Sequence, residues 1–402
     1  STASRLRMVG WLQYRHSSVF ELNSRIFAWS WTDERIHRAI TTNGKTKFQL
    51  GSNTNMGNMR VAMYYNNHDV RVEEMPVPEI GPGELLVKVE ASGICGSDVM
   101  EWYRIQRAPM VLGHEVAGTI VQAGAGVNRF REGDRMVVTH HVPCNACHYC
   151  LSGHHTVCDT LRETTFDPGG FSEYLRVPAI NVDRGVFTMP DGVSFDDAAF
   201  AEPLACVYRG QRRANIQPGQ SVIVLGSGLA GLLHINLARA LGAGKIIATD
   251  MVPDRLEAAK NLGADHTFLA TEDIPARLRE VNDGRLADLV IVCTGAPTAL
   301  QQGMDSVDRG GTVLFFAPTE PGVSISVPVN EMFFRNDATL TTTYAAAPGD
   351  LSTALEMIAT GRVQVGQMIS HRLGLDEAGL GFALTAEAQS SLKVIIQPQK
   401  GP

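Results

Sequence analysis

The sequence lacks any run of about 18 consecutive apolar residues, so it contains no candidate for a membrane-spanning helix. It also lacks an excess of basic residues: the net charge is −7 at pH 7, which gives no reason to expect nucleic acid as a partner. No internal repeat or low-complexity tract stands out, and seven cysteines in 402 residues do not make a disulfide scaffold. What remains is a chain that is 44% hydrophobic and 19% charged, long enough for two domains with separate cores.

Residues 1–58 differ in composition from the rest of the chain. They hold three of the four tryptophans and more basic than acidic residues. An Arg- and Ser-rich, acid-poor start is typical of an organelle transit peptide, but Met56 and Met59 both stand just before a self-contained domain. We therefore interpret residues 1–58 as an extension or linker, of vector origin or from a start assigned too far upstream, with residues 51–58 as a flexible connection.

Four cysteines form a compact motif in the first half of the chain, with the spacing C-x2-C-x2-C-x7-C. They are Cys144, Cys147, Cys150 and Cys158. Four thiolates suit the tetrahedral coordination of zinc, and a closed site of this kind leaves no position for a substrate. The iron–sulfur alternative has the run C-x2-C-x2-C-x3-C-P, whereas here the last gap is seven and Asp159 follows. The motif predicts a structural zinc site, and thiolates kept for a metal favour a reducing compartment, the cytoplasm.

The pattern of residues changes along the chain after residue 59. Short strand-like runs separated by Pro and Gly, such as 60–64, 85–91 and 116–121, indicate a β-rich domain up to about residue 204. After Pro218-Gly219 strand-like and helix-like segments alternate, which is typical of a parallel α/β sheet.

The second region carries a dinucleotide-binding motif. The apolar run 221–225 leads into a G-x-G-x-x-G sequence made by Gly226, Gly228 and Gly231, and residues 232–241 follow with a helical pattern. These glycines allow a tight turn, a close approach of backbone to a pyrophosphate, and close packing of helix on strand. Asp250 ends the next predicted strand, 245–249, where a carboxylate accepts hydrogen bonds from the adenosine ribose and repels a 2′-phosphate. The motif predicts NAD in preference to NADP, with Arg255 close enough to soften that choice.

A second metal site is suggested by residues of the β-rich region. Cys95 lies in a Gly-rich turn, and His114 and Glu115 follow Gly113. A catalytic zinc keeps about three protein ligands and an open fourth position. The third ligand is expected to be Glu202, beside the boundary between the two regions, or Glu115.

From about Met59 onward the chain resembles the zinc-dependent medium-chain alcohol dehydrogenases, in their sorbitol/polyol dehydrogenase-like branch. The stretches that carry the resemblance are GICGSD (93–98), GHEVAGTIVQAGAGV (113–127), REGDRMVV (131–138), the four-cysteine motif, GGFSEY (169–174), AEPLACVYRG (201–210), GSGLAG (226–231) and LKVIIQP (392–398). The resemblance implies a GroES-like catalytic domain and a Rossmann coenzyme domain. The expected divisions are 59–204 for the catalytic domain with its zinc lobe at about 142–160, 205–342 for the NAD-binding domain, and 343–402 for a return to the catalytic domain.

The resemblance also implies roles for individual residues. Cys95 and His114 would bind catalytic zinc with Glu202 or Glu115, Ser97 would pass the substrate proton outward, and Asp98 would orient His114. The residues expected to contact the dinucleotide are Gly226, Gly228, Leu229, Ala230, Gly231, Asp250, Arg255, Thr294 and Tyr344.

Three positions depart from the polyol branch. Met100 stands where that branch commonly has the histidine of a proton relay, and Glu101 stands where a tyrosine often lines the substrate pocket. An Arg-Tyr pair of the branch is replaced by Thr343-Tyr344. These changes alter the polarity of the expected pocket, so sorbitol itself is not predicted as the substrate.

The sequence therefore predicts an oxidoreductase that moves a hydride between NAD and a secondary alcohol, polyol or diol, with one catalytic and one structural zinc per subunit. A cytoplasmic homotetramer or dimer is expected from the family. The alternatives are a zinc-free quinone-type NADP reductase and a non-catalytic NAD-binding protein on the same fold. Both metal motifs disfavour the first, and a binding module has no use for an open metal site.

Overall fold

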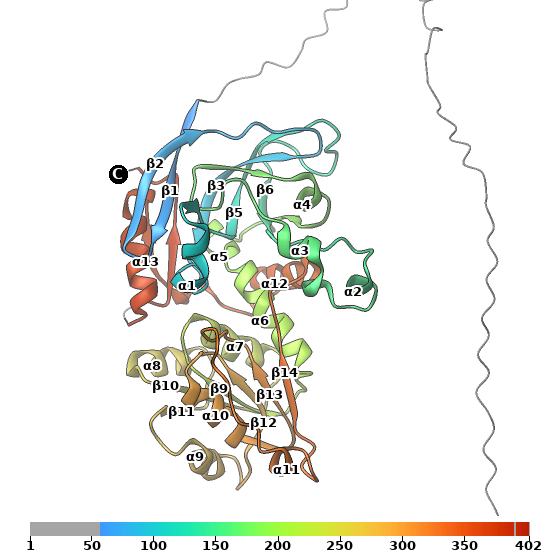
Figure 1. Cartoon of the computed structure of the whole chain (residues 1–402), viewed down its shortest axis with the longest axis vertical. Helices are drawn as coiled ribbons and strands as arrows, with labels where there is room; N and C mark the ends of the chain where they lie inside the picture. Colours follow the sequence, from blue (N-terminus) through green and yellow to red (C-terminus); the bar gives the residue numbers. More distant parts are fainter. Residues whose placement is uncertain (1–56, 390, 402) are drawn as a thin grey trace, which may run out of the picture. The chain divides into compact units, whose positions relative to one another are not determined.

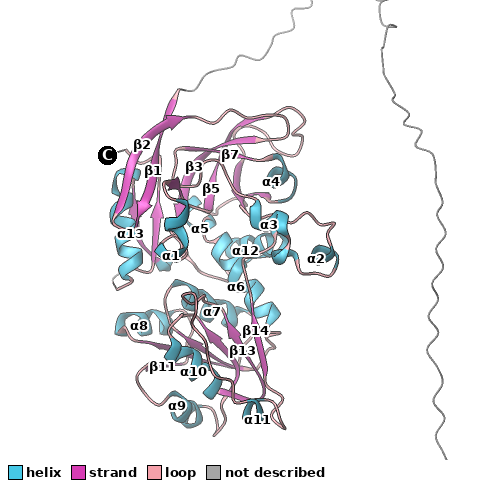
Figure 2. Cartoon of the chain, viewed as in Figure 1, coloured by secondary structure: helices cyan, strands magenta, loops and turns pink. Residues whose placement is uncertain are grey.

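The computed structural model describes residues 57–389 and 391–401. The interpretation of residues 1–58 as an extension falls almost wholly outside this range. Among the described residues, no helix has both the length and the apolar character needed to cross a bilayer. Figure 1 traces the chain, and Figure 2 shows strands gathered into separate sheets with helices beside them.

Two sheets make up the β-rich region. The larger has the strand order β15-β16-β3-β5-β6-β8 with β7 also paired to β3, and all its pairs except β15–β16 are antiparallel. The smaller has the order β2-β1-β4. The strands are β1 (Asn58–Asn66), β2 (Asp69–Pro76), β3 (Leu85–Gly93), β4 (Met110–Val111), β5 (Glu115–Ala123), β6 (Arg135–Val138), β7 (Tyr174–Val177), β8 (Val186–Thr188), β15 (Ile369–Leu373) and β16 (Lys393–Ile396). The chain thus returns to this region at its C-terminal end, where β16 pairs with β3.

The other region is built on a six-stranded sheet whose pairs are all parallel, in the order β11-β10-β9-β12-β13-β14. The strands are β9 (Ser221–Leu225), β10 (Lys245–Asp250), β11 (His266–Leu269), β12 (Ala287–Val292), β13 (Val307–Phe315) and β14 (Thr339–Thr342). Every residue of β9 is buried, as expected for a central parallel strand with both faces covered. The α/β class expected from the sequence, with a separate β-rich part, is confirmed.

The helices connect these strands, and some pack on the parallel sheet and others on the β-rich sheets. They are α1 (Glu101–Arg104), α2 (His148–Leu151), α3 (Asp159–Glu163), α4 (Ala179–Arg184), α5 (Phe195–Ala198), α6 (Ala201–Arg213), α7 (Leu229–Ala240), α8 (Pro253–Asn261), α9 (Ile274–Val281), α10 (Pro297–Asp305), α11 (Val329–Met332), α12 (Pro348–Ala359) and α13 (Ala378–Glu387), with 3-10 turns η1 (Ile105–Arg107), η2 (His155–Val157), η3 (Gly366–Met368) and η4 (Leu375–Glu377). Helix α7 begins three residues earlier than the pattern predicted, directly after Gly228.

The hydrophobic core explains why this architecture carries a site near the junction of the two regions. One buried cluster joins one face of the parallel sheet to helices α6, α7 and α12 and reaches Ala91, Ala117 and Ile395 of the larger β-sheet. Helix α6 packs on α7, α12 and β5. Because α6 is anchored on both sides, the residues at its start are held beside the ends of β3 and β5.

Candidate active site and coenzyme site

The candidate metal ligands of the β-rich region come together at the paired ends of β3 and β5. Gly93 lies opposite Glu115 in the ladder, so Cys95 after β3 and His114 before β5 are brought side by side. One ligand atom from each of Cys95, His114 and Glu115 lies within 4.8 Å of the others. Glu115 is fully buried, and the other two are partly buried. The arrangement presents a thiol, an imidazole and a carboxylate to one point, which is a donor set that suits zinc.

The buried carboxylate of Asp98 contacts both Cys95 and His114 and orients the imidazole. Its Oδ1 lies 3.4 Å from Nδ1 of His114, and its Oδ2 accepts a hydrogen bond from the backbone N–H of Cys95 at 3.1 Å. Burial opposes ionisation of Asp98, but the charges of His114 and Arg104 hold the pKa of this carboxyl below its usual range. With Nδ1 directed at Asp98, His114 has Nε2 available for a metal.

Glu202 lies in the first turn of α6, close to this cluster but outside the group of three. Its Oε1 accepts a hydrogen bond from Sγ of Cys206 at 3.7 Å. Burial, with a smaller contribution from the charge of Glu115, raises the pKa of Glu202 to about 7 against the opposing effect of His114. The sequence left Glu115 and Glu202 open as third ligand; the structure groups Glu115 with Cys95 and His114.

Sequence reasoning missed two cations at this site. Arg104, in α1, donates from Nε to the backbone oxygen of Ser97 at 2.9 Å and from Nη2 to Oγ of Ser97 at 3.2 Å. Lys393, the first residue of β16, donates from Nζ to Oε2 of Glu115. The sequence did offer one sign of Lys393: a lysine at the start of an otherwise apolar strand-like run, which the structure shows to be wholly buried. No comparable sequence pattern marked Arg104.

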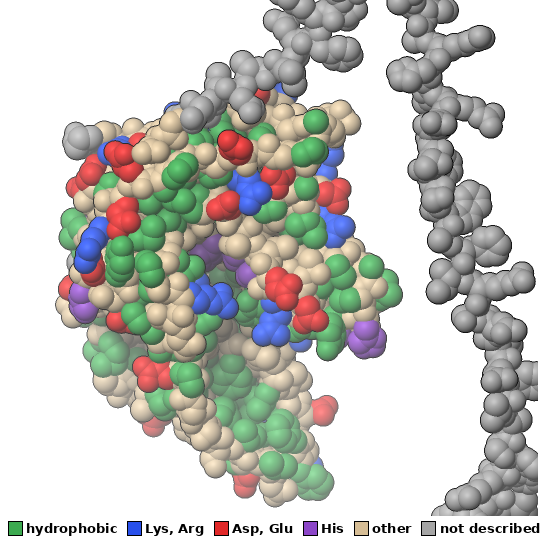
Figure 3. All heavy atoms as spheres, turned by 45° about the horizontal axis from the view of Figure 1, so that its top comes forward, with side chains coloured by type: hydrophobic (Ala, Val, Ile, Leu, Met, Phe, Trp, Pro, Cys, Tyr) green, Lys and Arg blue, Asp and Glu red, His purple; other side chains and the backbone are tan. Residues whose placement is uncertain are grey.

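Histidines and an aromatic residue line the approach to the cluster. The rings of His114 and His140 have centroids 4.8 Å apart, those of His140 and His141 3.7 Å, and those of His141 and Tyr344 6.3 Å. Burial holds the pKa of His140 well below its usual range and lowers that of His141 to about 4, so both rings are neutral at pH 7. Figure 3 shows a hollow on this face with histidine side chains inside it and Lys or Arg side chains beside it.

The four-cysteine motif folds into a separate lobe that includes α2, η2 and α3. One sulfur atom from each of Cys144, Cys147, Cys150 and Cys158 lies within 4.8 Å of the others, and none of the seven cysteines forms a disulfide. Backbone N–H groups of Ala146 and Cys147 donate to Sγ of Cys144 at 3.4 and 3.2 Å. Burial disfavours the thiolate of Cys158, but hydrogen bonds from backbone N–H groups and neighbouring thiols lower its pKa to about 6. The lobe therefore stabilises the thiolate of Cys158, the form that binds zinc, whereas burial raises the pKa of Cys150 to about 12 in the absence of a metal.

The glycine motif forms a tight turn between β9 and α7. Gly226 has φ +95°, a conformation that favours glycine, and a Cβ at Gly231 would lie 1.9 Å from the backbone oxygen of Gly226. Leu229 and Ala230 begin α7, and the first backbone N–H groups of a helix lack partners within it and can bind an anion. Thr294, which follows β12, packs beside Gly226: a Cβ added to Gly226 would lie 3.5 Å from the Cβ of Thr294.

Asp250 ends β10 beside this turn. Its Oδ2 accepts a hydrogen bond from the backbone N–H of Ser227 at 2.7 Å, and its Oδ1 accepts one from Val252 at 2.9 Å. Nη1 of Arg255 lies 4.0 Å from Oδ2 of Asp250. The glycine turn, Asp250, Arg255 and Thr294 thus meet at the carboxyl ends of neighbouring parallel strands, where such sheets bind nucleotides.

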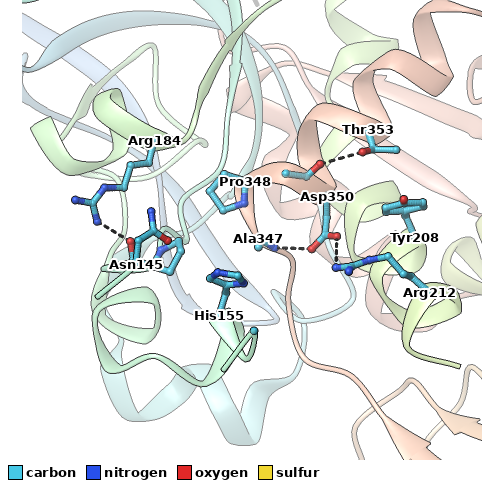
Figure 4. Close-up of a pocket in the computed structure, with 12 residues that line it drawn as sticks. Asn145, His155, Arg184, Tyr208, Arg212, Ala347, Pro348, Asp350 and Thr353 are labelled. Atoms are coloured by element: carbon cyan, nitrogen blue, oxygen red, sulfur yellow. Dashed lines mark hydrogen bonds and ion pairs between the residues drawn. The ribbon is translucent and has the colours of Figure 1, made fainter. Parts of the chain in front are cut away.

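A further pocket of about 640 Å³ lies between the cysteine lobe and helices α6 and α12 (Figure 4). Arg212 on α6 pairs with Asp350 on α12 at 2.8 Å, and Arg184 donates to the backbone oxygen of Pro143 at 2.7 Å. None of the candidate metal ligands lines this pocket. Its charged groups are occupied in joining α6 to α12 and α4 to the cysteine lobe.

Comparisons with known proteins agree with this geometry. Residues 81–191 match the alcohol dehydrogenase GroES-like domain, and residues 230–360 match the zinc-binding dehydrogenase domain. The chain is 31% identical over 358 residues to the sorbitol dehydrogenase of Bacillus subtilis, an alignment that covers 85% of this chain and 98% of that protein. It is 32% identical over 349 residues to a probable D-xylulose reductase A of Aspergillus clavatus, with 82% and 94% covered.

Solved structures show the same fold. A proposed zinc-binding dehydrogenase of Sinorhizobium meliloti 1021, bound to NADP, superimposes with a TM-score of 0.76 at 29% identity. The superposition covers 85% of this chain and 100% of that protein's chain. The chain therefore belongs to the zinc-binding medium-chain alcohol dehydrogenases, in the sorbitol dehydrogenase-like branch, and is an oxidoreductase that acts on CH–OH groups.

Proposed function

We propose that this enzyme oxidises a secondary alcohol, polyol or diol to the ketone or aldehyde, with NAD as hydride acceptor and a zinc ion held by Cys95, His114 and a glutamate. The observation that carries the proposal is the meeting of Cys95, His114 and Glu115 within 4.8 Å, with Asp98 on the far side of the imidazole. A structural role alone needs neither an incomplete donor set nor an oriented histidine.

The residues present fit a catalytic zinc. A thiol, an imidazole and a carboxylate make three ligands and leave a fourth position for substrate. Oε1 of Glu115 is buried and has no hydrogen-bond partner within the described chain, as expected of an oxygen that awaits a cation. This geometry favours Glu115 as the third ligand in the resting enzyme, with Glu202, whose carboxyl senses the charges of His114 and Glu115, as the carboxylate that would exchange with it.

The protein side chains have separate roles in the reaction. Zinc supplies Lewis acidity toward an alcohol or carbonyl oxygen, and the nicotinamide supplies the hydride chemistry. Asp98 holds His114 in the tautomer and orientation that present Nε2. Ser97 passes the substrate proton outward to water or to the nicotinamide ribose. Since Arg104 donates to Oγ of Ser97 and cannot accept a proton, the Ser97 hydroxyl is left to donate elsewhere.

NAD is proposed as the coenzyme. The turn at Gly226 and the start of α7, with Leu229 and Ala230, would hold the pyrophosphate. Asp250 would accept hydrogen bonds from the hydroxyls of the adenosine ribose. Thr294 and Tyr344 are assigned to the nicotinamide end. Arg255, 4.0 Å from Asp250, is the group that would have to bind a 2′-phosphate if NADP were used.

The cysteine quartet is proposed to hold a second, structural zinc, because its four thiolates close the coordination shell. In this assignment residues 59–204 and 343–402 form the catalytic domain and residues 205–342 form the coenzyme domain. A cytoplasmic location follows from reduced thiolates, and a homotetramer or dimer follows from the family resemblance.

A substrate panel tests the proposal. Secondary alcohols, polyols, vicinal diols and amino alcohols would each be incubated with NAD or NADP, and reduced coenzyme would be followed by its absorbance. Turnover with at least one secondary alcohol, faster with NAD, is expected. A protein that binds NAD but reduces it with none of these substrates would contradict the proposal.

A further inference from the structure

Lys393 is a fully buried lysine, which is unusual because lysines are almost never fully buried unless they are paired. It stands 278 positions from Glu115 in the chain, and β16 brings it beside the candidate metal site. The remaining residues of β16 are apolar and buried. The strand therefore carries a single charge, which it places next to the buried carboxylate of Glu115.

The Lys393 ammonium has defined partners. Nζ donates to Oε2 of Glu115 and to the backbone oxygen of Ile94 at 3.0 Å, and it lies 5.9 Å from the ring of Phe200. The neighbouring residue has to be small: a Cβ at Gly93 would lie 2.0 Å from Oε2 of Glu115 and 2.6 Å from Cε of Lys393. The backbone of β3 thus leaves room for this ion pair and for little else.

The two oxygens of Glu115 are in different situations. Oε2 is engaged by Lys393, whereas Oε1 is buried without a partner in the described chain. An oxygen of the same carboxylate lies within 4.8 Å of the ligand atoms of Cys95 and His114. One oxygen is held by a cation, and the other is left for a metal.

We propose that Lys393 is a positioning residue that grips Glu115 through Oε2 and so presents Oε1 to a divalent metal at Cys95 and His114. The inference rests on the proposed function, because it concerns the same metal site. A buried carboxylate deprived of its cation is strongly disfavoured, and without Lys393 nothing else in the described chain holds Oε2 of Glu115 in this position. A displaced Glu115 is lost as a ligand, so the metal affinity depends on a residue that does not itself touch the metal. Partners of metal ligands typically contribute about 10–100-fold to metal affinity.

The test is a double-mutant cycle in the full-length protein with zinc as the probe. Wild type, Lys393→Met, Glu115→Gln and the double variant would be titrated with a chromophoric zinc chelator, and the dissociation constant of the more weakly held zinc would be measured. Lys88→Met is the matched control. Lys88 also pairs with a glutamate, since its Nζ lies 3.1 Å from Oε1 of Glu90, and both residues belong to β3 and not to the metal cluster. The absorption bands of Co²⁺ in the same site would report the geometry of coordination independently of activity.

We expect Lys393→Met to weaken the open site by about 10–100-fold and to shift the Co²⁺ bands, with the cysteine-bound zinc and the Lys88 control unchanged. The double variant should bind zinc as Glu115→Gln does, within about twofold, because Lys393 acts only through Glu115. If Lys393→Met, which leaves a buried carboxylate unpaired, does not fold, the comparison of the double variant with Glu115→Gln can still refute the inference.

Two results would overturn the inference. One is a Lys393→Met protein that melts at a lower temperature but binds zinc as the wild type does, which would make the ion pair purely structural. The other is a double variant far weaker than Glu115→Gln. A wild-type protein with zinc only in the cysteine quartet would instead overturn the proposed function, so the two failures are distinguishable.

Discussion

Nη2 of Arg104 lies 3.2 Å from Oγ of Ser97 and 3.3 Å from Oδ1 of Asp98. One guanidinium therefore joins the hydroxyl proposed to pass the proton and the carboxylate that orients His114. The side chain is largely enclosed, with an exposed fraction of 13%, and its planar group lies 4.8 Å from the centroid of the Tyr103 ring. Arg104 thus stands next to the relay hydroxyl in a chain that has Met100 at the usual histidine position.

Replacing Arg104 with alanine should lower kcat/KM for the alcohol by about 10–100-fold, because Ser97 and Asp98 lose the guanidinium that donates hydrogen bonds to both and fixes their positions. The affinity for NAD, measured by binding without substrate, should not change. Arg107→Ala is the matched control, since Arg107 is an exposed arginine in the adjacent turn. Equal activity of the two variants would show that Arg104 does not position Ser97 and Asp98 for the reaction.

Replacing Asp250 with asparagine should move coenzyme preference toward NADP. The amide keeps an oxygen that can accept from Ser227 or Val252, but it removes the charge that repels a 2′-phosphate, and Arg255 stays 4.0 Å away. We expect the ratio of kcat/KM for NADP to that for NAD to rise about tenfold, which corresponds to about 1.4 kcal/mol. Asp254→Asn, at an exposed position in the first turn of α8, should leave the ratio unchanged. A wild-type enzyme that already prefers NADP would contradict the assignment.

Local spacing made part of this site predictable. The cysteine quartet lies within 15 consecutive positions, and the glycine motif lies between a strand and a helix, so short-range geometry determines both. Fold class and family followed from these motifs and their order. The contacts of Lys393 with Glu115 could not be predicted, because 278 positions separate them and only the pairing of β16 with β3 makes them neighbours. For the same reason the sequence could not rank Glu115 against Glu202.

Glu202 should make the stability of the metal-free protein depend on pH. Burial raises its pKa to about 7 from an ordinary value of 4.5, so the folded state holds a proton that the unfolded state releases. Stability from this group is complete below about pH 4.5 and is lost as pH rises toward 7, by about 3 kcal/mol in total. The difference in unfolding free energy between wild type and Glu202→Gln, measured from pH 4 to 8 after removal of metal, should show this fall. A flat difference would mean that folding does not shift the pKa of Glu202.

Replacing Cys147 with serine should lower the stability of the protein without abolishing hydride transfer in the molecules that remain folded. The lobe would lose one of four thiolates, and with it the zinc proposed to order this segment. We expect the melting temperature to fall by at least about 5 °C and one zinc to be lost, while the remaining folded protein still transfers hydride. A variant of unchanged melting temperature that selectively loses hydride transfer would show that the quartet takes part in the reaction.

Alcohol oxidation is proposed to take place at a zinc held by Cys95 and His114. The most direct measurement compares wild type with Cys95→Ser in zinc content, NAD binding and NADH formation from an accepted secondary alcohol. We expect the variant to lose one of two zinc ions and all measurable turnover, while it binds NAD as the wild type does. A Cys95→Ser protein with full turnover, or with its zinc content unchanged, would contradict it.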